Sequence, residues 1–196
     1  SVENAAALCA DLGHDVAEAS PQFDYATLRT ACMKSWAAGI KKWVDGMAAA
    51  TGRRISLDTL EAATFAMYKY GASLSAYDLL KAMDGLNAVC RAIGPFFETY
   101  DVLITPATAN VAPPLKTYDQ NRPNITHEQW FDHKGTYPPF LAAFNVTGQP
   151  AMSVPLGLSR DGLPMGVQFV GRFGREDTLL ALATQLEQAR PWQPRL

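Results

Sequence analysis

The sequence predicts an α/β fold in which helices surround a mixed sheet of few strands. Apolar residues recur at three- and four-residue steps through the first half of the chain, as in amphipathic helices. Beyond residue 100, short continuous apolar runs bounded by turn residues replace that period, as in buried strands. The chain has 196 residues, of which 48% are apolar and 18% charged. It is therefore long enough and apolar enough for a single domain with a sizeable core.

A short helix and a long helix are predicted first. Residues 2–12 have an apolar face and are followed by Gly13, a common residue just beyond a helix. Residues 15–19 alternate weakly between polar and apolar, which predicts a short strand. Residues 24–50 then carry apolar side chains at helical steps, and Gly52 closes this long helix.

The next two helices begin with residue pairs that resemble capping boxes, in which two side chains bond each other's backbone N–H groups. Asp58 with Glu61 predicts the start of one helix, and Ser75 with Asp78 predicts the start of the other. Pro95 lacks the N–H that a helix interior needs, so the second of these helices is expected to end just before it.

The second half of the chain predicts the strands. Residues 100–106 resemble a strand that is buried on both faces. Residues 107–139 are polar and proline-rich, and a loop of these 33 residues is expected to have a function or to cover the sheet. A brief helix is expected over 140–144. The remaining apolar runs predict a hairpin over 151–158 and 165–170, turning at Asp161 and Gly162, and a closing helix over Glu176–Ala189.

Composition excludes several classes of function. The formal charge is −2, from 17 basic and 19 acidic residues, so no basic surplus exists for nucleic-acid binding. No run of about 18 apolar residues occurs, so no membrane span is expected. Three widely spaced cysteines predict reduced thiols in a cytoplasmic protein. The scattered histidines predict no metal site, and we expect His127 and His133 to lie on a surface loop.

Two motifs resemble the C-terminal end of the amidase signature family. They are FNVTGQPAMSVPLG at 144–157 and GLPMGVQFVG at 162–171. The predicted strand at 100–106 and the closing helix at 176–192 keep the family's order and spacing over most of 90–192. The helical part before them is most similar to the 6-aminohexanoate cyclic-dimer hydrolase branch, which opens cyclic amides.

This resemblance implies a single large α/β domain, about twice as long as this chain, that hydrolyses or transfers amides without a cofactor. A serine attacks the carbonyl, a second serine in a cis peptide relays the proton, a lysine is the base and a glycine- and serine-rich loop stabilises the oxyanion. Here no Ser-Ser or Gly-Gly pair occurs. We therefore expect residues 1–196 to be one domain that is the C-terminal fragment of a larger amidase, with no catalytic residue of its own.

The function expected of such a fragment is to shape the pocket for a small-molecule amide. Two alternatives stay open: a non-catalytic scaffold or binding subunit that pairs with a separate catalytic chain, and a small-molecule binding protein that acts alone. At least four short strands are few for so many apolar helices. We therefore also expect one helical face to need a partner, and a homo-oligomer is one way to supply it.

Four residues are the candidates for substrate binding. Cys32 and Trp36 lie one turn apart on the long helix, and Tyr137 and Phe140 precede a turn. The resemblance implies that these residues line the acyl pocket, and such pockets favour aromatic side chains with few polar groups. The alternative for Cys32 and Trp36 is the core of the fold, and for Tyr137 and Phe140 it is cover over the sheet.

Two further positions bear on the substrate. The glutamine-dependent transamidases of the family hold the charged groups of glutamine with an arginine and an aspartate, which align near Leu86 and Pro138 here. Both positions are uncharged, which predicts a neutral acyl group. Gln168, in the middle of a predicted strand, is expected to bond backbone or a neighbouring loop.

Overall fold

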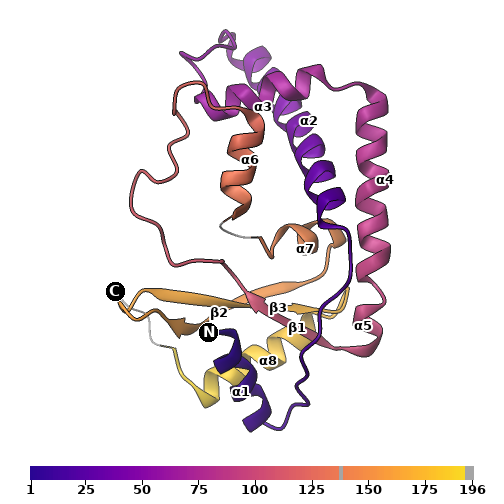
Figure 1. Ribbon diagram of the computed structural model, residues 1–196, viewed down its shortest axis with the longest axis vertical. Coiled ribbons are helices and arrows are strands. Elements are labelled where there is room, and N and C mark those ends of the chain that lie inside the picture. The colour runs from indigo at the N-terminus through magenta and orange to yellow at the C-terminus, as the bar shows by residue number, and fades with distance from the viewer. Residues whose placement is uncertain (137–138, 193–196) are drawn as a thin grey trace. The chain divides into compact units, whose positions relative to one another are not determined.

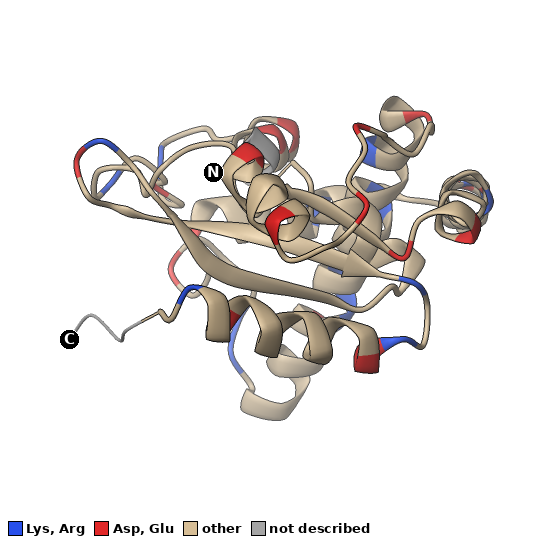
Figure 2. Ribbon diagram, turned by 90° about the horizontal axis from the view of Figure 1, so that it is seen from below, with Lys and Arg blue, Asp and Glu red and all other residues tan. Residues whose placement is uncertain are grey.

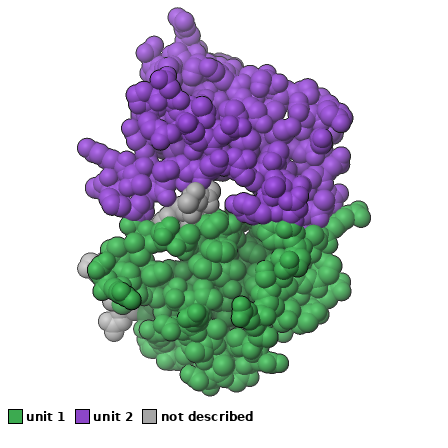
Figure 3. Space-filling view, in the orientation of Figure 1, with its two compact units in different colours: residues 1–23, 90–112, 138–196 green, residues 24–89, 113–137 purple. Residues whose placement is uncertain are grey.

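The computed structural model describes residues 1–136 and 139–192, and it confirms the α/β fold class (Figure 1). These residues form two compact units, shown in different colours in Figure 3. The sheet unit comprises residues 1–23, 90–112 and 138–196, and the helical unit comprises residues 24–89 and 113–137. The helices and strands of the sheet unit are α1 (Val2–Asp11), α5 (Phe96–Thr99), β1 (Val102–Pro106), α7 (Ala142–Thr147), β2 (Ala151–Leu158), β3 (Pro164–Gly171) and α8 (Glu176–Ala189). The helical unit contains α2 (Tyr25–Thr51), α3 (Ala62–Ser73), α6 (His127–Thr136) and most of α4 (Ala76–Ile93).

The sheet has three strands in the order β1-β3-β2, and both pairings are antiparallel. The hairpin of β2 and β3 is confirmed, and Gly162 in its turn has the positive φ of 76° that favours glycine. The prediction of at least four strands in a mixed sheet was wrong for the described residues. Residues 15–19 form no strand, because their weak alternation has no neighbouring strand with which to pair.

β1 is an edge strand of this sheet, and only Leu103 within it is fully buried. The prediction of a strand buried on both faces was therefore wrong, because a continuous apolar run does not distinguish an edge strand from a central one. β3 is the central strand, and Val167, Phe169 and Val170 are all 0% exposed. α1 and α8 pack against one face of the sheet through Ala5, Cys9, Leu179, Leu182 and Leu186 (Figures 1 and 2).

The helical unit is built on close packing of α2 against α3. Asp24 caps α2 by accepting hydrogen bonds from the N–H groups of Ala26 and Thr27, and Gly52 ends the helix in the left-handed conformation. A Cβ on Gly71 would lie 2.2 Å from the carbonyl oxygen of Ala37, so only glycine permits this approach. Small residues at the contact therefore set the spacing of the two helices.

The two predicted capping boxes had different outcomes. Ser75 and Asp78 form one at the start of α4, because Asp78 N–H donates to the Ser75 hydroxyl and Ser75 N–H donates to the Asp78 carboxylate. The pairing of Asp58 with Glu61 was wrong. α3 begins at Ala62 and its first N–H groups bond residues far along the chain, Asn121 Oδ1 at 3.1 Å and the Gln120 carbonyl at 2.9 Å.

The expected loop over 107–139 contains a helix, α6. Thr126 and Gln129 form a capping box at its start, because each backbone N–H bonds the other side chain. His127 and His133 therefore lie on a helix and not on a loop. His127 stacks on Tyr70 with ring centroids 3.9 Å apart. No helix in the described part of the chain is long and apolar enough to cross a membrane.

Candidate substrate-binding site

Cys32 and Trp36 lie on the face of α2 that is directed at α6. The Arg29 Nε donates to Asp132 Oδ1 over 2.6 Å at one end of this face. At the other end, Trp36 packs edge-to-face on Phe131 with ring centroids 5.9 Å apart. Cys32 is three residues after Arg29 and four before Trp36, so it shares their face of the helix. The structure thus brings two of the four candidate residues together.

This face is apolar and electrically neutral. Burial raises the pKa of the Cys32 thiol, so the sulfur is protonated at neutral pH and is a weak hydrogen-bond donor, not a nucleophile. Arg29 is neutralised by Asp132. Trp36 is 44% exposed, so it is not a core residue, and part of its ring is available for contact. Its described side chains can recognise shape and apolar surface, and the charge of Arg29 among them is paired with Asp132.

Phe140 belongs to the sheet unit, where it lies just before α7 and is 38% exposed. Its backbone is attached to the central strand. Gln168 Nε2 donates to Thr105 Oγ1 over 2.9 Å and to the Phe140 carbonyl over 3.5 Å. Gln168 is only 4% exposed, so its amide depends on these partners. The prediction that Gln168 bonds backbone or a neighbouring loop is confirmed.

Three further positions discussed from the sequence are Tyr137, Pro138 and Leu86. Tyr137 and Pro138 lie outside the described residues. Leu86 is half-buried on α4. Of the four candidates, Cys32 and Trp36 belong to the helical unit and Phe140 to the sheet unit.

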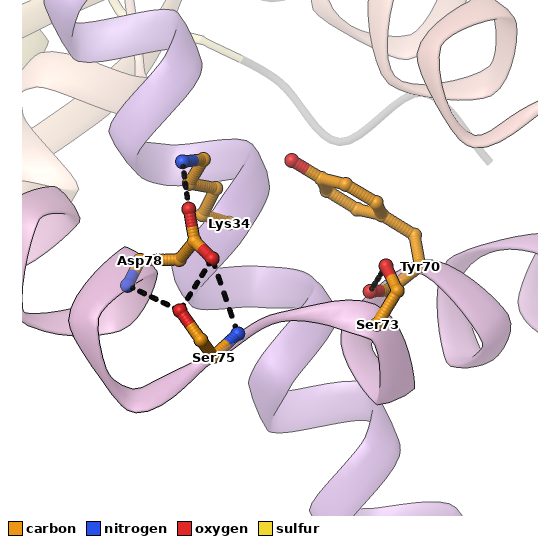
Figure 4. Close-up of polar contacts among 5 residues, drawn as sticks. All are labelled: Lys34, Tyr70, Ser73, Ser75 and Asp78. Atoms are coloured by element: carbon orange, nitrogen blue, oxygen red, sulfur yellow. Dashed lines mark hydrogen bonds and ion pairs between the residues drawn. The ribbon is translucent and has the colours of Figure 1, made fainter.

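An ionic cluster that sequence reasoning missed joins α2 to the start of α4 (Figure 4). Lys34 Nζ donates to one carboxylate oxygen of Asp78 over 2.9 Å, and the Ser75 hydroxyl and N–H donate to the other. These bonds, from Ser75 first and then Lys34, hold the pKa of Asp78 well below its usual range. Figure 4 shows the Tyr70 hydroxyl directed toward Lys34. Lys34 and Asp78 are far apart in sequence, so no local spacing could have revealed the pair.

This cluster limits what Lys34 can do chemically. The hydrogen bond with Asp78 raises the pKa of Lys34, so its amine stays protonated and cannot act as a base at neutral pH. Lys41 also stays protonated, because its hydrogen bond to Asp45 raises its pKa. No group of three or more histidine, cysteine or acidic side chains in the described ranges is placed to hold a metal ion.

Comparison with known proteins identifies the class. The Amidase family matches residues 1–180, and the chain belongs to this family. It is 30% identical over 214 residues to the 6-aminohexanoate-cyclic-dimer hydrolase of Paenarthrobacter ureafaciens, covering all of this chain and 41% of that protein. The lipoamidase of Enterococcus faecalis is 29% identical over 208 residues, covering 95% of this chain and 28% of that protein.

Solved structures agree on the fold. The structure of 6-aminohexanoate cyclic dimer hydrolase complexed with substrate matches with a TM-score of 0.83 at 30% identity, covering 97% of this chain and 41% of that one. A bacterial aryl acylamidase of the amidase signature family matches with a TM-score of 0.73 at 18% identity, which supports the fold alone. The chain thus spans about two fifths of the length of the hydrolase that it matches throughout.

Proposed function

We propose that this chain is the C-terminal, pocket-forming part of an amidase that hydrolyses a neutral or cyclic amide, and that the catalytic serines and lysine lie outside these 196 residues. One observation carries the proposal. The whole chain matches 6-aminohexanoate-cyclic-dimer hydrolase, yet it spans only 41% of that protein. A fragment of this size can supply the pocket wall while the remaining length supplies the reacting groups.

The chemistry of the described residues supports both parts of the proposal. A serine nucleophile needs an adjacent base that is free to accept a proton. Lys34 and Lys41 are bonded to aspartates that keep them protonated. The α2 face offers a neutral thiol and an aromatic ring, which suit an amide that carries no charge.

Turnover measurements test this proposal. The purified 196-residue chain should hydrolyse 6-aminohexanoate cyclic dimer and simple anilides no faster than background, because losing members of a catalytic triad removes several orders of magnitude of rate. The protein made from the longer reading frame that includes this chain should hydrolyse at least one of these amides. Robust turnover by the 196-residue chain, abolished by a single substitution within it, would contradict the proposal. Activity that appears only with a separate catalytic chain would instead favour a binding subunit.

A further inference from the structure

A second candidate site lies at the C-terminal end of α2, within the helical unit and apart from the face that carries Cys32. It is a groove open to solvent, with a volume of about 160 Å³. One wall is α2, and the other is the loop of residues 53–60 that follows it. The apolar side chains lining the groove are Trp43, Val44, Met47, Ala48, Ile55 and Leu60.

The groove is preformed by hydrogen bonds in the turn that follows α2. The Thr51 hydroxyl donates to the Met47 carbonyl over 2.7 Å, and Gly52 reverses the chain with a φ of 67°. Farther on, the Thr59 hydroxyl donates to the Arg54 carbonyl over 2.6 Å. These bonds hold the loop wall in place. Ligand binding would therefore lose little conformational entropy through ordering of the loop.

The lining is more exposed than apolar side chains of this size usually are. Trp43 is 60% exposed and Met47 is 47% exposed, while Val44 between them is buried and forms the floor. A concave apolar surface with two large exposed side chains is typical of a ligand groove, whereas a single exposed apolar residue is not.

Two arginines give the groove a charge preference. Arg53 and Arg54 both line it, and neither makes an ion pair with a carboxylate among the described residues. Asp45, the acidic residue of α2, is bonded to Lys41, and Asp58 in the loop does not line the groove. A guanidinium presents paired N–H donors that match the two oxygens of a carboxylate. Apolar walls with two available arginines therefore fit an amphipathic anion.

We propose that this groove binds a carboxylate with an aliphatic or aromatic tail, with the tail along α2 and the carboxylate on Arg53 and Arg54. Hydrolysis of an amide with an apolar acyl group releases a carboxylate of this class. That source of the ligand rests on the proposed function, but the binding itself does not. The groove would then let the protein sense or retain the acyl product at a place separate from the pocket face of α2.

Calorimetric titration of the 196-residue chain with octanoate tests the proposal. Octanoate should bind saturably, and octanamide, which has the same tail without the charge, should bind roughly tenfold more weakly or worse. Acetate should not bind, because it lacks the tail. Equal affinity for octanoate and octanamide would overturn the carboxylate assignment. The absence of saturable octanoate binding would overturn the site.

Variants locate the ligand. Replacing both arginines, Arg53→Met with Arg54→Met, should weaken octanoate binding by about tenfold or more, whereas Arg160→Met at the hairpin turn should leave it unchanged. Ala48→Phe should also weaken it, because the added ring fills the groove while both charges remain. Circular dichroism checks that each variant folds. If the double variant is less stable but binds octanoate with unchanged affinity, the carboxylate assignment is overturned. The arginines would then act only on the partial negative charge at the C-terminal end of α2. If the longer protein is inactive but octanoate still binds, the amidase proposal fails and the binding site is supported.

Discussion

The sheet unit and the helical unit are stabilised by different kinds of contact. The three strands of the sheet unit contain no charged residue (Figure 2). The core of this unit is an apolar cluster that includes Phe169 and Val167. The helical unit also has close contacts between small residues and several ion pairs. Three of the four ion pairs in the described part of the chain belong to it: those of Arg29 and Lys34 join two helices, and that of Lys41 with Asp45 lies within α2. The sheet unit is thus stabilised mainly by the burial of apolar side chains. The helical unit has, in addition, specific ion pairs between side chains.

This difference indicates in which unit amino-acid substitutions should lower stability least. Apolar burial tolerates little loss of volume, because a cavity removes both transfer energy and packing. Exposed ion pairs contribute little each and can be exchanged at small cost. The proposed substrate residues Cys32 and Trp36 lie in the helical unit, where substitutions that retune recognition should disturb stability least.

The largest expected effect is in the sheet core. Phe169→Ala should lower the free energy of unfolding by about 3–5 kcal/mol, because the ring is 0% exposed on the central strand. Phe173→Ala is the matched control. That ring is 72% exposed, and its loss should change stability by about 0.5 kcal/mol or less. Urea unfolding followed by circular dichroism measures both. Similar losses in the two variants would show that the core does not centre on β3.

The next effect is at the contact of α2 with α3. Gly71→Ala should destabilise by about 1–3 kcal/mol, because the new methyl would meet the Ala37 carbonyl oxygen, 2.2 Å from the ideal Cβ position. Gly39→Ala, on α2 with nothing within 4 Å of its Cβ position, should instead stabilise by up to about 1 kcal/mol. Thermal unfolding of the two variants separates the outcomes. A neutral Gly71→Ala would mean that the helices are not in close contact there.

A smaller effect follows from Asp78. Its pKa is lowered in the folded state, so its charge stabilises the fold above the unfolded value of about 3.9, and this contribution is lost as the pH falls through the folded pKa. Asp78→Asn should therefore destabilise most at neutral pH and progressively less below about pH 4. Asp161→Asn, in the hairpin turn, serves as the control. Urea midpoints across this pH range check the sign. A loss that does not depend on pH would contradict the role of the charge.

The smallest effect concerns Cys32. In the longer amidase proposed above, Cys32→Ala should slightly weaken the binding of a preferred apolar amide, because a thiol is a weak donor. It should leave the turnover of a very small amide unchanged. Cys90→Ala is a control, since that thiol donates to the Val146 carbonyl within the sheet unit. Steady-state kinetics on the two substrates measure both variants. An equal response of Cys32→Ala on both substrates would place Cys32 in the structural core.

The sequence predicted elements with local signals in both units, and it missed features that depend on contacts far along the chain. α8 and β2 have the predicted bounds because their apolar period and flanking turn residues are local signals. The start of α3 was missed because its N–H groups bond Asn121 and Gln120, which lie far along the chain. α6 did carry a local signal, the Thr126 and Gln129 capping box, that could have been found. For the candidate site, the sequence placed Cys32 and Trp36 on one face, but it could not reveal that α6 lies opposite or that Lys34 is bonded to Asp78.

Substrate preference in the longer amidase proposed above tests the central claim, that this chain forms the pocket and supplies no reacting group. The measurement is the ratio of kcat/KM for a large apolar amide to that for a very small amide, in Trp36→Ala and in Phe140→Ala. The account predicts that this ratio falls by about tenfold or more in each variant, because one to three kcal/mol of apolar contact with the large substrate is lost. It also predicts that kcat for the small amide stays unchanged. An unchanged ratio, or an equal loss of kcat on both substrates, would contradict the account.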